Sequence, residues 1–537
     1  MKKIISMLML LVTAGMLINC TKKEPVAEVG GSSLVRIKVE IFDRGTDGGK
    51  TDAANNQWTR WIQEKIRRDE NIIVEFVKVN RWTETEALVN LFAAGDQPDV
   101  CYTYSGDNIQ NWADQGGIFD LAPYVDTTLK DLKAFLGPDK ALAGKDFIRR
   151  NIETNTGRIF SIPARRMSVA QRNIWIRKDW LDILGLPLPT TTEEFENALI
   201  AFKTQDPGGV TSARVIPFTL NGDRPDWEAG NIMEAFIDPA LSDRERWINT
   251  VAERSFAVAG YKDGLRFMNK LYNENLVDRD FPIHSSSTTD VANLIKSGVV
   301  GSFCGEWDVI YREPDGLLTD LRKNVPTADI VPIDPIQSPD GLTHKSMYDA
   351  AGINFFIPAS AAKDPSVADA AMRYLNWMAK YENYHFIQTG HEGISHSVIE
   401  GVIKLDPSAA ADPTWIMNSS QNIDYTMMMN GLFLESEEAS IRALAAGYSW
   451  SADLITQAYN TALTNAKPGL VVKTSSPLIV AGPLVQTLSD MGRSIYASSI
   501  TCPVAAFDST YDTAVRNWLA SGAQAIIDER REKFVQP

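Results

Sequence analysis

The sequence has few of the residues that build disulfide frameworks and metal centres. Its 537 residues include four cysteines and five histidines. Neither the cysteines nor the histidines form the closely spaced pairs that bind zinc or make redox motifs. Cys101 and Cys304 lie in apolar runs typical of buried strands. We therefore expect no disulfide framework, no metal site and no cofactor.

Positive charge and long apolar runs are also in short supply. No stretch after residue 20 is apolar over the roughly 20 residues that a membrane-crossing helix needs. Lysine and arginine number 53 against 68 acidic residues, so the formal net charge is −15. An acidic protein is repelled by nucleic acids and anionic lipids. We expect no nucleic-acid partner, and a body of more than one domain that lies outside the bilayer.

The N-terminus is the exception to this pattern. Two lysines precede an apolar run of about fifteen residues, which ends at Cys20 and is followed by polar chain. This layout predicts a signal peptide over residues 1–19, and Cys20 predicts a lipobox, with a lipidated, palmitate-bearing flexible tether over residues 20–34. Asn19 departs from the small residue usual before the lipidated cysteine. An ordinary signal peptide with an incidental cysteine and a short membrane anchor are the alternatives.

Strands alternate with helices along most of the remaining chain. Expected strands show apolar alternation or β-branched runs, and expected helices show apolar residues at helical spacing. Such alternation predicts parallel pairing in an α/β sheet. Residues 436–466 and 508–534 are expected to be helical, which predicts a helix-rich C-terminal part. The expected strands are Val35–Phe42, Ile72–Val79, Asp99–Thr103, Arg172–Ile176, Val299–Phe303 and Gly352–Pro358.

Four stretches resemble one known family. Trp175–Phe195 contains Arg-Lys-Asp-Trp-Leu, then a glycine, a proline and Pro-Thr-Thr-Thr-Glu-Glu-Phe. Shorter matches are Leu91–Val100, Gly157–Pro163 and Leu271–Asp278. In order and spacing these stretches resemble the extracellular solute-binding proteins of ABC importers, in the sugar and oligosaccharide-binding family 1 and its large lipoprotein branch.

The resemblance implies a two-lobed, periplasmic-binding-protein-like fold of class II with a cleft between the lobes. The N-lobe is expected to comprise residues 35–165 and 350–398, and the C-lobe residues 166–349 and 399–537. Chain crossings are expected near Pro163–Arg172, Met347–Gly352 and His396–Val402.

The resemblance also implies a monomeric, passive binder rather than an enzyme. Such a protein captures a carbohydrate, by size an oligosaccharide, and delivers it to the transmembrane subunits of an ABC permease. It is exported and touches the membrane only through its lipid anchor, with its body outside the cytoplasm. One alternative is a ligand-binding lipoprotein that serves a sensor or polysaccharide adhesion. Another is a glycoside hydrolase, since the 68 acids alone do not decide against a catalytic carboxylate pair.

One departure from the family concerns calcium. Members of this branch often carry an oxygen-rich, calcium-holding loop after a Phe-Lys and Asp-Pro pattern. Here Phe202–Arg214 keeps a single carboxylate, Asp206. Calcium needs several hard oxygen ligands, so we predict no calcium in this loop.

A sugar-binding cleft needs flat aromatic faces for pyranose rings and polar groups for their hydroxyls. Ligands sit beyond the carboxyl ends of strands. The arginines near the first crossing are expected either to bond sugar hydroxyls or to recognise a carboxylate such as that of a uronic acid. For each aromatic residue core packing is the alternative, and for each arginine a surface salt bridge. Trp58, Trp61, Trp180 and Trp377 lie on expected helices and are predicted to be core. The candidate ligand-binding residues are Trp82, Tyr104, Asp107, Arg166, Arg172, Trp227, Glu306, Trp307 and Asp308.

Overall fold

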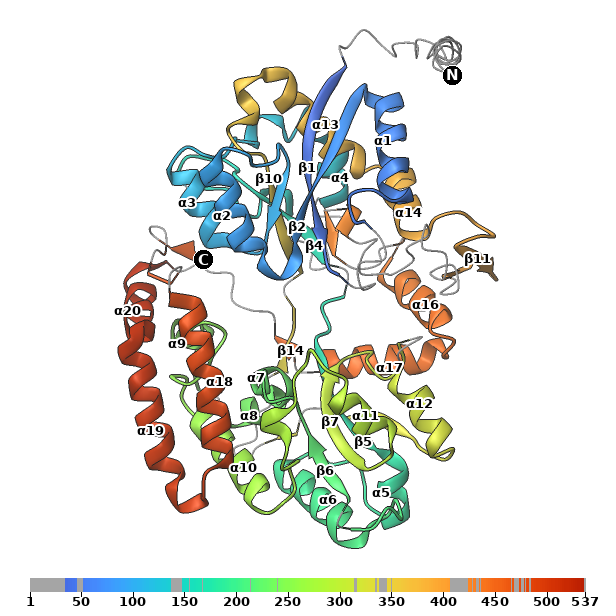
Figure 1. Ribbon diagram of the computed structural model, residues 1–537, viewed down its shortest axis with the longest axis vertical. Helices are drawn as coiled ribbons and strands as arrows, with labels where there is room; N and C mark the ends of the chain where they lie inside the picture. The colour runs from blue at the N-terminus through green and yellow to red at the C-terminus, as the bar shows by residue number, and fades with distance from the viewer. Residues whose placement is uncertain are drawn as a thin grey trace, which may run out of the picture.

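A computed structural model shows the chain as two lobes, one above the other in Figure 1. It describes residues 34–535 except 46–51, 137–146, 154, 167, 213, 239, 313–315, 334–335, 338–344, 349, 406–423, 427, 431–433, 435, 465, 468–472, 475–477, 479 and 482–483. Cys20 and the predicted signal peptide and tether up to residue 33 lie outside the described residues. Within the described part, no helix has the length and apolar character that crossing a bilayer requires.

The first lobe, at the top of Figure 1, is built on a mixed sheet. β1 and β2 are parallel, β3 joins β1 through a Val39–Val100 bridge, and β10 is antiparallel to β3 and β4. Across the sheet the strands are β2 (Ile72–Asn80), β1 (Val35–Asp43), β3 (Cys101–Thr103), β10 (Ala351–Phe356), β4 (Ile162–Arg166) and β13 (Met429–Asn430).

Helices flank this sheet and close its core. Trp58 and Trp377 are almost fully buried among the strand residues, and Trp61 packs on the same cluster, so the core prediction for these three residues is confirmed. The helices are α1 (Gln57–Glu70), α2 (Glu84–Ala94), α3 (Gly106–Asp114), α4 (Lys130–Leu136), α13 (Pro365–Met378) and α14 (Tyr381–Thr389).

The second lobe has its own sheet, in the order β6 (Ile216–Thr219), β7 (Val300–Glu306), β5 (Arg172–Arg177) and β8 (Ile330–Ile333). The expectation of purely parallel pairing is wrong here, because β5 is antiparallel to both β7 and β8. β5 enters from the connection and runs away from the first lobe, whereas β7 and β8 run back. The end of β7 therefore lies beside the start of β5, with Glu306 opposite Arg172.

Helices surround the second sheet, and the C-terminal part is helix-rich as predicted. Trp180 on α5 is fully buried, which confirms its core prediction. α18, α19 and α20 form a red column at the left of Figure 1, and the Tyr496 hydroxyl on α18 lies 2.8 Å from the Tyr261 hydroxyl on α10. α18 was not among the expected helices.

The bounds of the second-lobe helices are α5 (Lys178–Leu184), α6 (Thr192–Gln205), α7 (Pro225–Glu228), α8 (Gly230–Met233), α9 (Asp243–Asn249), α10 (Tyr261–Asn273), α11 (Asp290–Lys296), α12 (Leu317–Asn324), α16 (Glu437–Gly447), α17 (Ala452–Leu463), α18 (Val485–Thr501), α19 (Phe507–Trp518) and α20 (Gln524–Lys533). Short strand pairs outside the two main sheets are β11 (His396–Ile399) with β12 (Val402–Leu405), β9 (Lys345–Ser346) with β14 (Ala466–Lys467), and β15 (Lys473–Thr474) with β16 (Phe534–Val535).

The chain passes between the two sheets from β4 to β5 and returns from β8 to β10. The third expected crossing, at His396–Val402, is wrong. Glu400 and Gly401 have positive φ values and form the turn of the β11–β12 hairpin, which projects at the right of Figure 1.

The described residues of 424–430 lie with the first lobe instead, because β13 pairs with β4 and Met429 contributes to the first core. The segment containing Tyr425 and Met429 therefore belongs with the first lobe, although the expected C-lobe included it. The other lobe bounds stay a prediction.

Candidate functional site

Tyr348 lies on one of the segments that connect the lobes. Its backbone N–H donates a hydrogen bond of 2.9 Å to the carbonyl of Val169, so two connecting segments run side by side. The guanidinium carbon of Arg166 lies 4.3 Å from the Tyr348 ring centroid, and the Trp227 ring centroid lies 6.0 Å from it. Burial, together with the charge of Glu306, raises the pKa of Tyr348 to about 12. The phenol is therefore a neutral hydrogen-bonding group at physiological pH.

Arg172 and Trp227 form a stacked pair beside this tyrosine. The guanidinium carbon of Arg172 lies 4.6 Å from the Trp227 ring centroid. Arg172 also donates from Nη1 to the carbonyl of Asp226 at 3.1 Å, and to that of Trp227. A Cβ at Gly230 would lie 3.1 Å from Nη2, so the guanidinium packs closely on the backbone of this glycine. Arg172 is 5 % exposed, and its orientation is fixed by these contacts.

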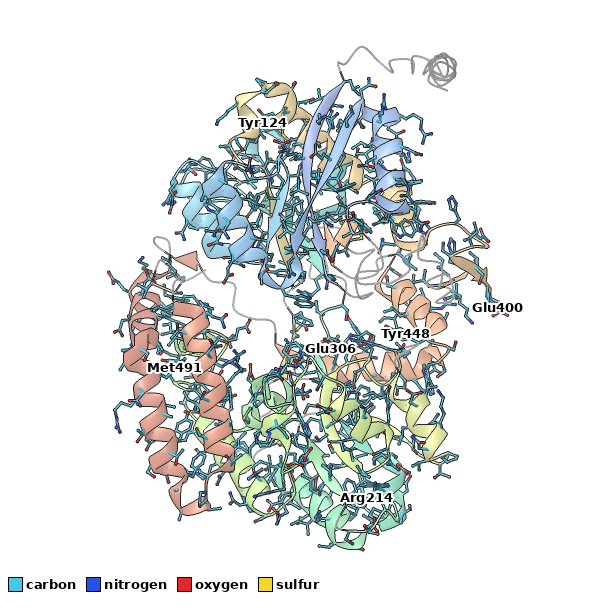
Figure 2. The ribbon with its side chains drawn as sticks, in the orientation of Figure 1. Tyr124, Arg214, Glu306, Glu400, Tyr448 and Met491 are labelled. Atoms are coloured by element: carbon cyan, nitrogen blue, oxygen red, sulfur yellow. The ribbon has the colours of Figure 1, made fainter. Side chains whose placement is uncertain are left out.

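A second arginine stands at the end of β7. Arg312 donates from Nε to Asp308 at 3.0 Å and from Nη2 at 2.6 Å, and it also pairs with Glu306. The Tyr448 hydroxyl donates to the other oxygen of Asp308 at 3.1 Å. Burial alone would lower the pKa of Arg312, but the charges of Asp308 and Glu306 outweigh it and raise the pKa well above its ordinary value. Figure 2 shows Glu306 where the lower lobe faces the upper one, with Tyr448 to its right.

The structure therefore brings five of the nine predicted residues into one group with Tyr348. They are Arg166, Arg172, Trp227, Glu306 and Asp308. Sequence reasoning missed Tyr348 and Arg312. Tyr348 lies within the crossing expected at Met347–Gly352, so its position was available as a signal, whereas nothing in the sequence distinguishes Arg312 from other arginines.

Two predictions for this group need correction. Trp307 is 6 % exposed and packs edge-to-face on Tyr459, with ring centroids 5.1 Å apart, in a core of the second lobe. Trp307 lies one residue beyond the end of β7, in the turn that follows, and its side chain turns into the lobe. Asp308 is 5 % exposed and both its oxygens already accept hydrogen bonds, from Arg312 and Tyr448. It orients Arg312 rather than facing a ligand.

Trp82 and Tyr104 belong to a separate group on the first lobe, around Arg81. The guanidinium carbon of Arg81 lies 4.2 Å from the Tyr104 ring centroid and 5.5 Å from that of Trp82. Trp82 is 69 % exposed and is held by a 3.3 Å hydrogen bond from Nε1 to the carbonyl of Arg44. The arrangement offers an exposed indole on a fixed side chain.

The two groups are connected through the segment before β13. Asp424 accepts a 2.8 Å hydrogen bond from Nη2 of Arg44, the residue that holds Trp82. Six residues later, Asn430 is the register partner of Arg166. Burial raises the pKa of Asp424 despite its ion pair with Arg44. Asp107 lies in α3, but its side chain is outside the described residues, so its candidate role stays a prediction.

The loop after α6 uses its carboxylate internally. The side chain of Asp206 accepts backbone hydrogen bonds from Val210 at 3.0 Å and from Thr211 at 2.8 Å. Among the described residues, no three potential metal-ligating His, Cys, Asp or Glu side chains gather in one place.

We expect that neither calcium nor a calcium chelator shifts the melting temperature of the purified protein. The physical reason is that one carboxylate, already hydrogen bonded, is too few hard oxygen ligands for calcium. Differential scanning fluorimetry with added calcium and with EGTA measures this. A calcium-dependent rise that disappears in Asp206→Ala would show that the loop does hold the ion.

The chain matches known proteins over most of its length. The family of bacterial extracellular solute-binding proteins matches residues 55–384. The fructooligosaccharide ABC transporter substrate-binding protein FusA of Streptococcus pneumoniae is 27% identical over 203 residues, which are 35% of this chain and 36% of FusA. The polygalacturonan/rhamnogalacturonan-binding protein YtcQ of Bacillus subtilis is 21% identical over 480 residues, 88% of each chain.

A solved structure supports the architecture. The alginate-binding protein AlgQ2, in a crystal structure without calcium, superimposes with a TM-score of 0.63. The superposition covers 93% of this chain and 98% of AlgQ2 at 16% identity. At this identity the likeness concerns the fold, which is that of a two-lobed solute-binding protein. With residues 55–384 matched, the chain belongs to the family of bacterial extracellular solute-binding proteins.

Proposed function

We propose that this protein is the substrate-binding component of an ABC importer and captures an oligosaccharide between its lobes. The observation that carries the proposal is the group around Tyr348, in which Trp227 offers an aromatic face and Arg166 and Glu306 offer polar groups. Aromatic faces and charged hydrogen-bonding groups are the combination that recognises sugars. FusA and YtcQ, by their names, bind a fructooligosaccharide and pectic polysaccharides.

Both lobes contribute to this capture in the proposal. Arg166 and Trp82 are placed by the first lobe, and Trp227 and Glu306 by the second. A ligand that touches both sets stabilises a closed arrangement, because those contacts exist only when the lobes approach. The closed protein then docks on the permease subunits as a monomer and releases the sugar.

The protein is proposed to bind without changing its ligand. The carboxylates of Glu306 and Asp308, in the group around Tyr348, both pair with Arg312. Carboxylates already engaged by an arginine are not placed as the free acid and nucleophile or base that glycoside hydrolysis uses. Incubation of the protein with oligosaccharides should therefore leave their chain lengths unchanged by chromatography.

Membership in an extracellular family supports an exported protein whose body lies outside the cytoplasm. We propose that lipid on Cys20 holds it at a membrane, because an exported binder must stay near its permease. Mass spectrometry of the mature N-terminus tests this. A diacylglyceryl-modified Cys20 supports the proposal, and a mature chain that begins elsewhere would contradict it.

A thermal-shift screen of oligosaccharides tests the proposed function. A ligand that binds only the folded state raises the melting temperature, and at 100 times its Kd it stabilises the protein by about 2.7 kcal/mol. We expect at least one oligosaccharide to do so. Stabilisation by peptides but by no carbohydrate would overturn the substrate class. Uptake of the identified sugar by cells with and without the gene separates transport from sensing or adhesion.

A further inference from the structure

We infer that the ligand carries carboxylates, and that Arg166 and Arg172 recognise them, so that the protein selects uronate-containing oligosaccharides over neutral ones. This inference rests on the proposed function and specifies its substrate class. It starts from a contrast within the group around Tyr348: among the residues that the structure describes, some arginines have carboxylate partners and two have none.

The acids of this group are already engaged by other arginines. Glu306 and Asp308 pair with Arg312, and Asp226 pairs with Arg254. Glu306 is the direct cross-strand neighbour of Arg172, yet its carboxylate lies within ion-pair distance of Arg312 instead. The positive charge of Arg172 acts to lower the pKa of Asp226, but the ion pair of Asp226 is with Arg254.

Arg166 and Arg172 are left without such a partner. Within the described part of the chain, neither guanidinium lies within 4.0 Å of a carboxylate oxygen. Arg166 stacks on Tyr348, and Arg172 stacks on Trp227 and donates to two backbone carbonyls. The Nε atoms of both arginines are buried without a hydrogen-bond partner among the described residues. Buried polar groups in native proteins almost always have partners, so these two cations are prepared for acceptors that the described chain does not supply.

Charge strengthens this argument. The whole protein carries a formal charge of −15, yet among the described residues of and beside this group four arginines, Arg166, Arg172, Arg254 and Arg312, face three acids, Glu306, Asp308 and Asp226. A cationic site in an acidic protein is costly unless an anion completes it. The guanidinium plane binds a carboxylate through two parallel hydrogen bonds, which a neutral sugar hydroxyl does not offer.

The closing experiment compares ligands that differ only in charge. Isothermal titration calorimetry is performed with trigalacturonate, with its methyl ester, and with trimers of mannuronate and glucuronate, at low and high ionic strength. We expect at least one acidic trimer to bind tenfold or more tightly than its methyl ester, and its affinity to fall with salt. Arg166→Gln should lower the affinity for that trimer by about tenfold to a hundredfold, which is the usual effect of losing a charged hydrogen bond.

Arg214→Gln is the matched control, because it removes the same charge from a residue that is exposed at the far end of the second lobe in Figure 2. It should leave the affinity unchanged. Arg172→Gln is a second test, with circular dichroism to show that it folds. If neutral trimers or methyl esters bind as tightly as the acids, or if Arg214→Gln weakens binding as much as Arg166→Gln, this inference is overturned while the proposed function stands. If no carbohydrate binds, the proposed function itself fails.

Discussion

Replacing Arg254 by alanine is expected to lower the free energy of unfolding by about 3–5 kcal/mol, the usual effect of breaking a buried ion pair from one side. The Arg254 side chain is 7% exposed and pairs with Asp226 on α7. It also donates a 3.1 Å hydrogen bond to Ser489 on α18, and a Cβ at Gly492 would lie 2.8 Å from its Nε. Arg254 thus joins the C-terminal helices to the short helix that carries Trp227. Urea unfolding followed by circular dichroism measures the loss.

The pH dependence of this loss has a definite sign. Burial raises the pKa of Asp226 even with Arg254 in place, and removing the cation raises it further. A carboxyl whose pKa is higher in the folded than in the unfolded state favours folding at low pH, and this contribution is lost as the pH rises through the folded pKa. The deficit of Arg254→Ala should therefore be larger at pH 7 than in mild acid, where Asp226 takes up a proton.

Two further variants make this prediction specific. Arg254→Ala with Asp226→Asn should be more stable than Arg254→Ala alone, because no uncompensated charge remains. Arg493→Ala removes an exposed ion pair with Asp490 on α18, the helix that carries Ser489. It should lower the free energy of unfolding by at most about 1 kcal/mol. Equal deficits for Arg254→Ala and Arg493→Ala, or a deficit that does not change with pH, would contradict the assignment of a buried charge pair.

Trp180→Ala is expected to cost about 3–5 kcal/mol of folding free energy, as is usual when a large buried aromatic side chain is deleted. Trp180 is fully buried, and its ring lies edge-to-face with Phe202 at 5.2 Å between centroids. Cβ atoms at Gly208 and Gly301 would lie 2.7 and 3.0 Å from this indole, so the backbone encloses it closely. The enclosed space would not collapse easily around an alanine. Urea unfolding again gives the measurement.

Trp82→Ala is the matched comparison. Trp82 is 69% exposed and contributes little buried area, so its loss should change the free energy of unfolding by less than about 1 kcal/mol. Trp82→Ala should instead lower the affinity for the identified oligosaccharide in calorimetry, because an exposed aromatic face is lost from the binding surface. If Trp82→Ala destabilised the fold as much as Trp180→Ala, the indole would be a structural element and not a ligand platform.

Local structure was predicted well because its causes are local. Thr191 caps the helix that follows it: its hydroxyl accepts the Glu194 N–H at 3.1 Å, and the Glu194 carboxylate accepts the Thr191 N–H at 3.2 Å. The strand at Val35 was visible because alternate residues are buried, and Ile37 and Val39 are fully so. Each feature depends on residues within a few positions of one another, so a single sequence carries it.

The candidate site was predicted only in part, for the opposite reason. A residue at a strand end was expected to face the ligand, but Glu306 points to the interlobe side while its neighbour Trp307 enters the core. Nothing in the sequence shows that Arg312 would take the carboxylates of Glu306 and Asp308 and leave Arg172 without one. That choice depends on which side chains meet across strands and loops, and a shift of one residue reverses it.

The sequence by itself determined most of the secondary structure and the helix-borne aromatic core, because capping and periodicity act over short distances, and its resemblance to a known family implied the two-lobed fold. Only the tertiary structure decided which lobe holds the segment before β13, that β5 runs antiparallel to its neighbours, and that Tyr348 stands among the arginines. These features arise where segments far apart in the chain meet. Their free energy comes from contacts that no stretch of sequence contains alone, and the proposed specificity of the protein depends on the same contacts.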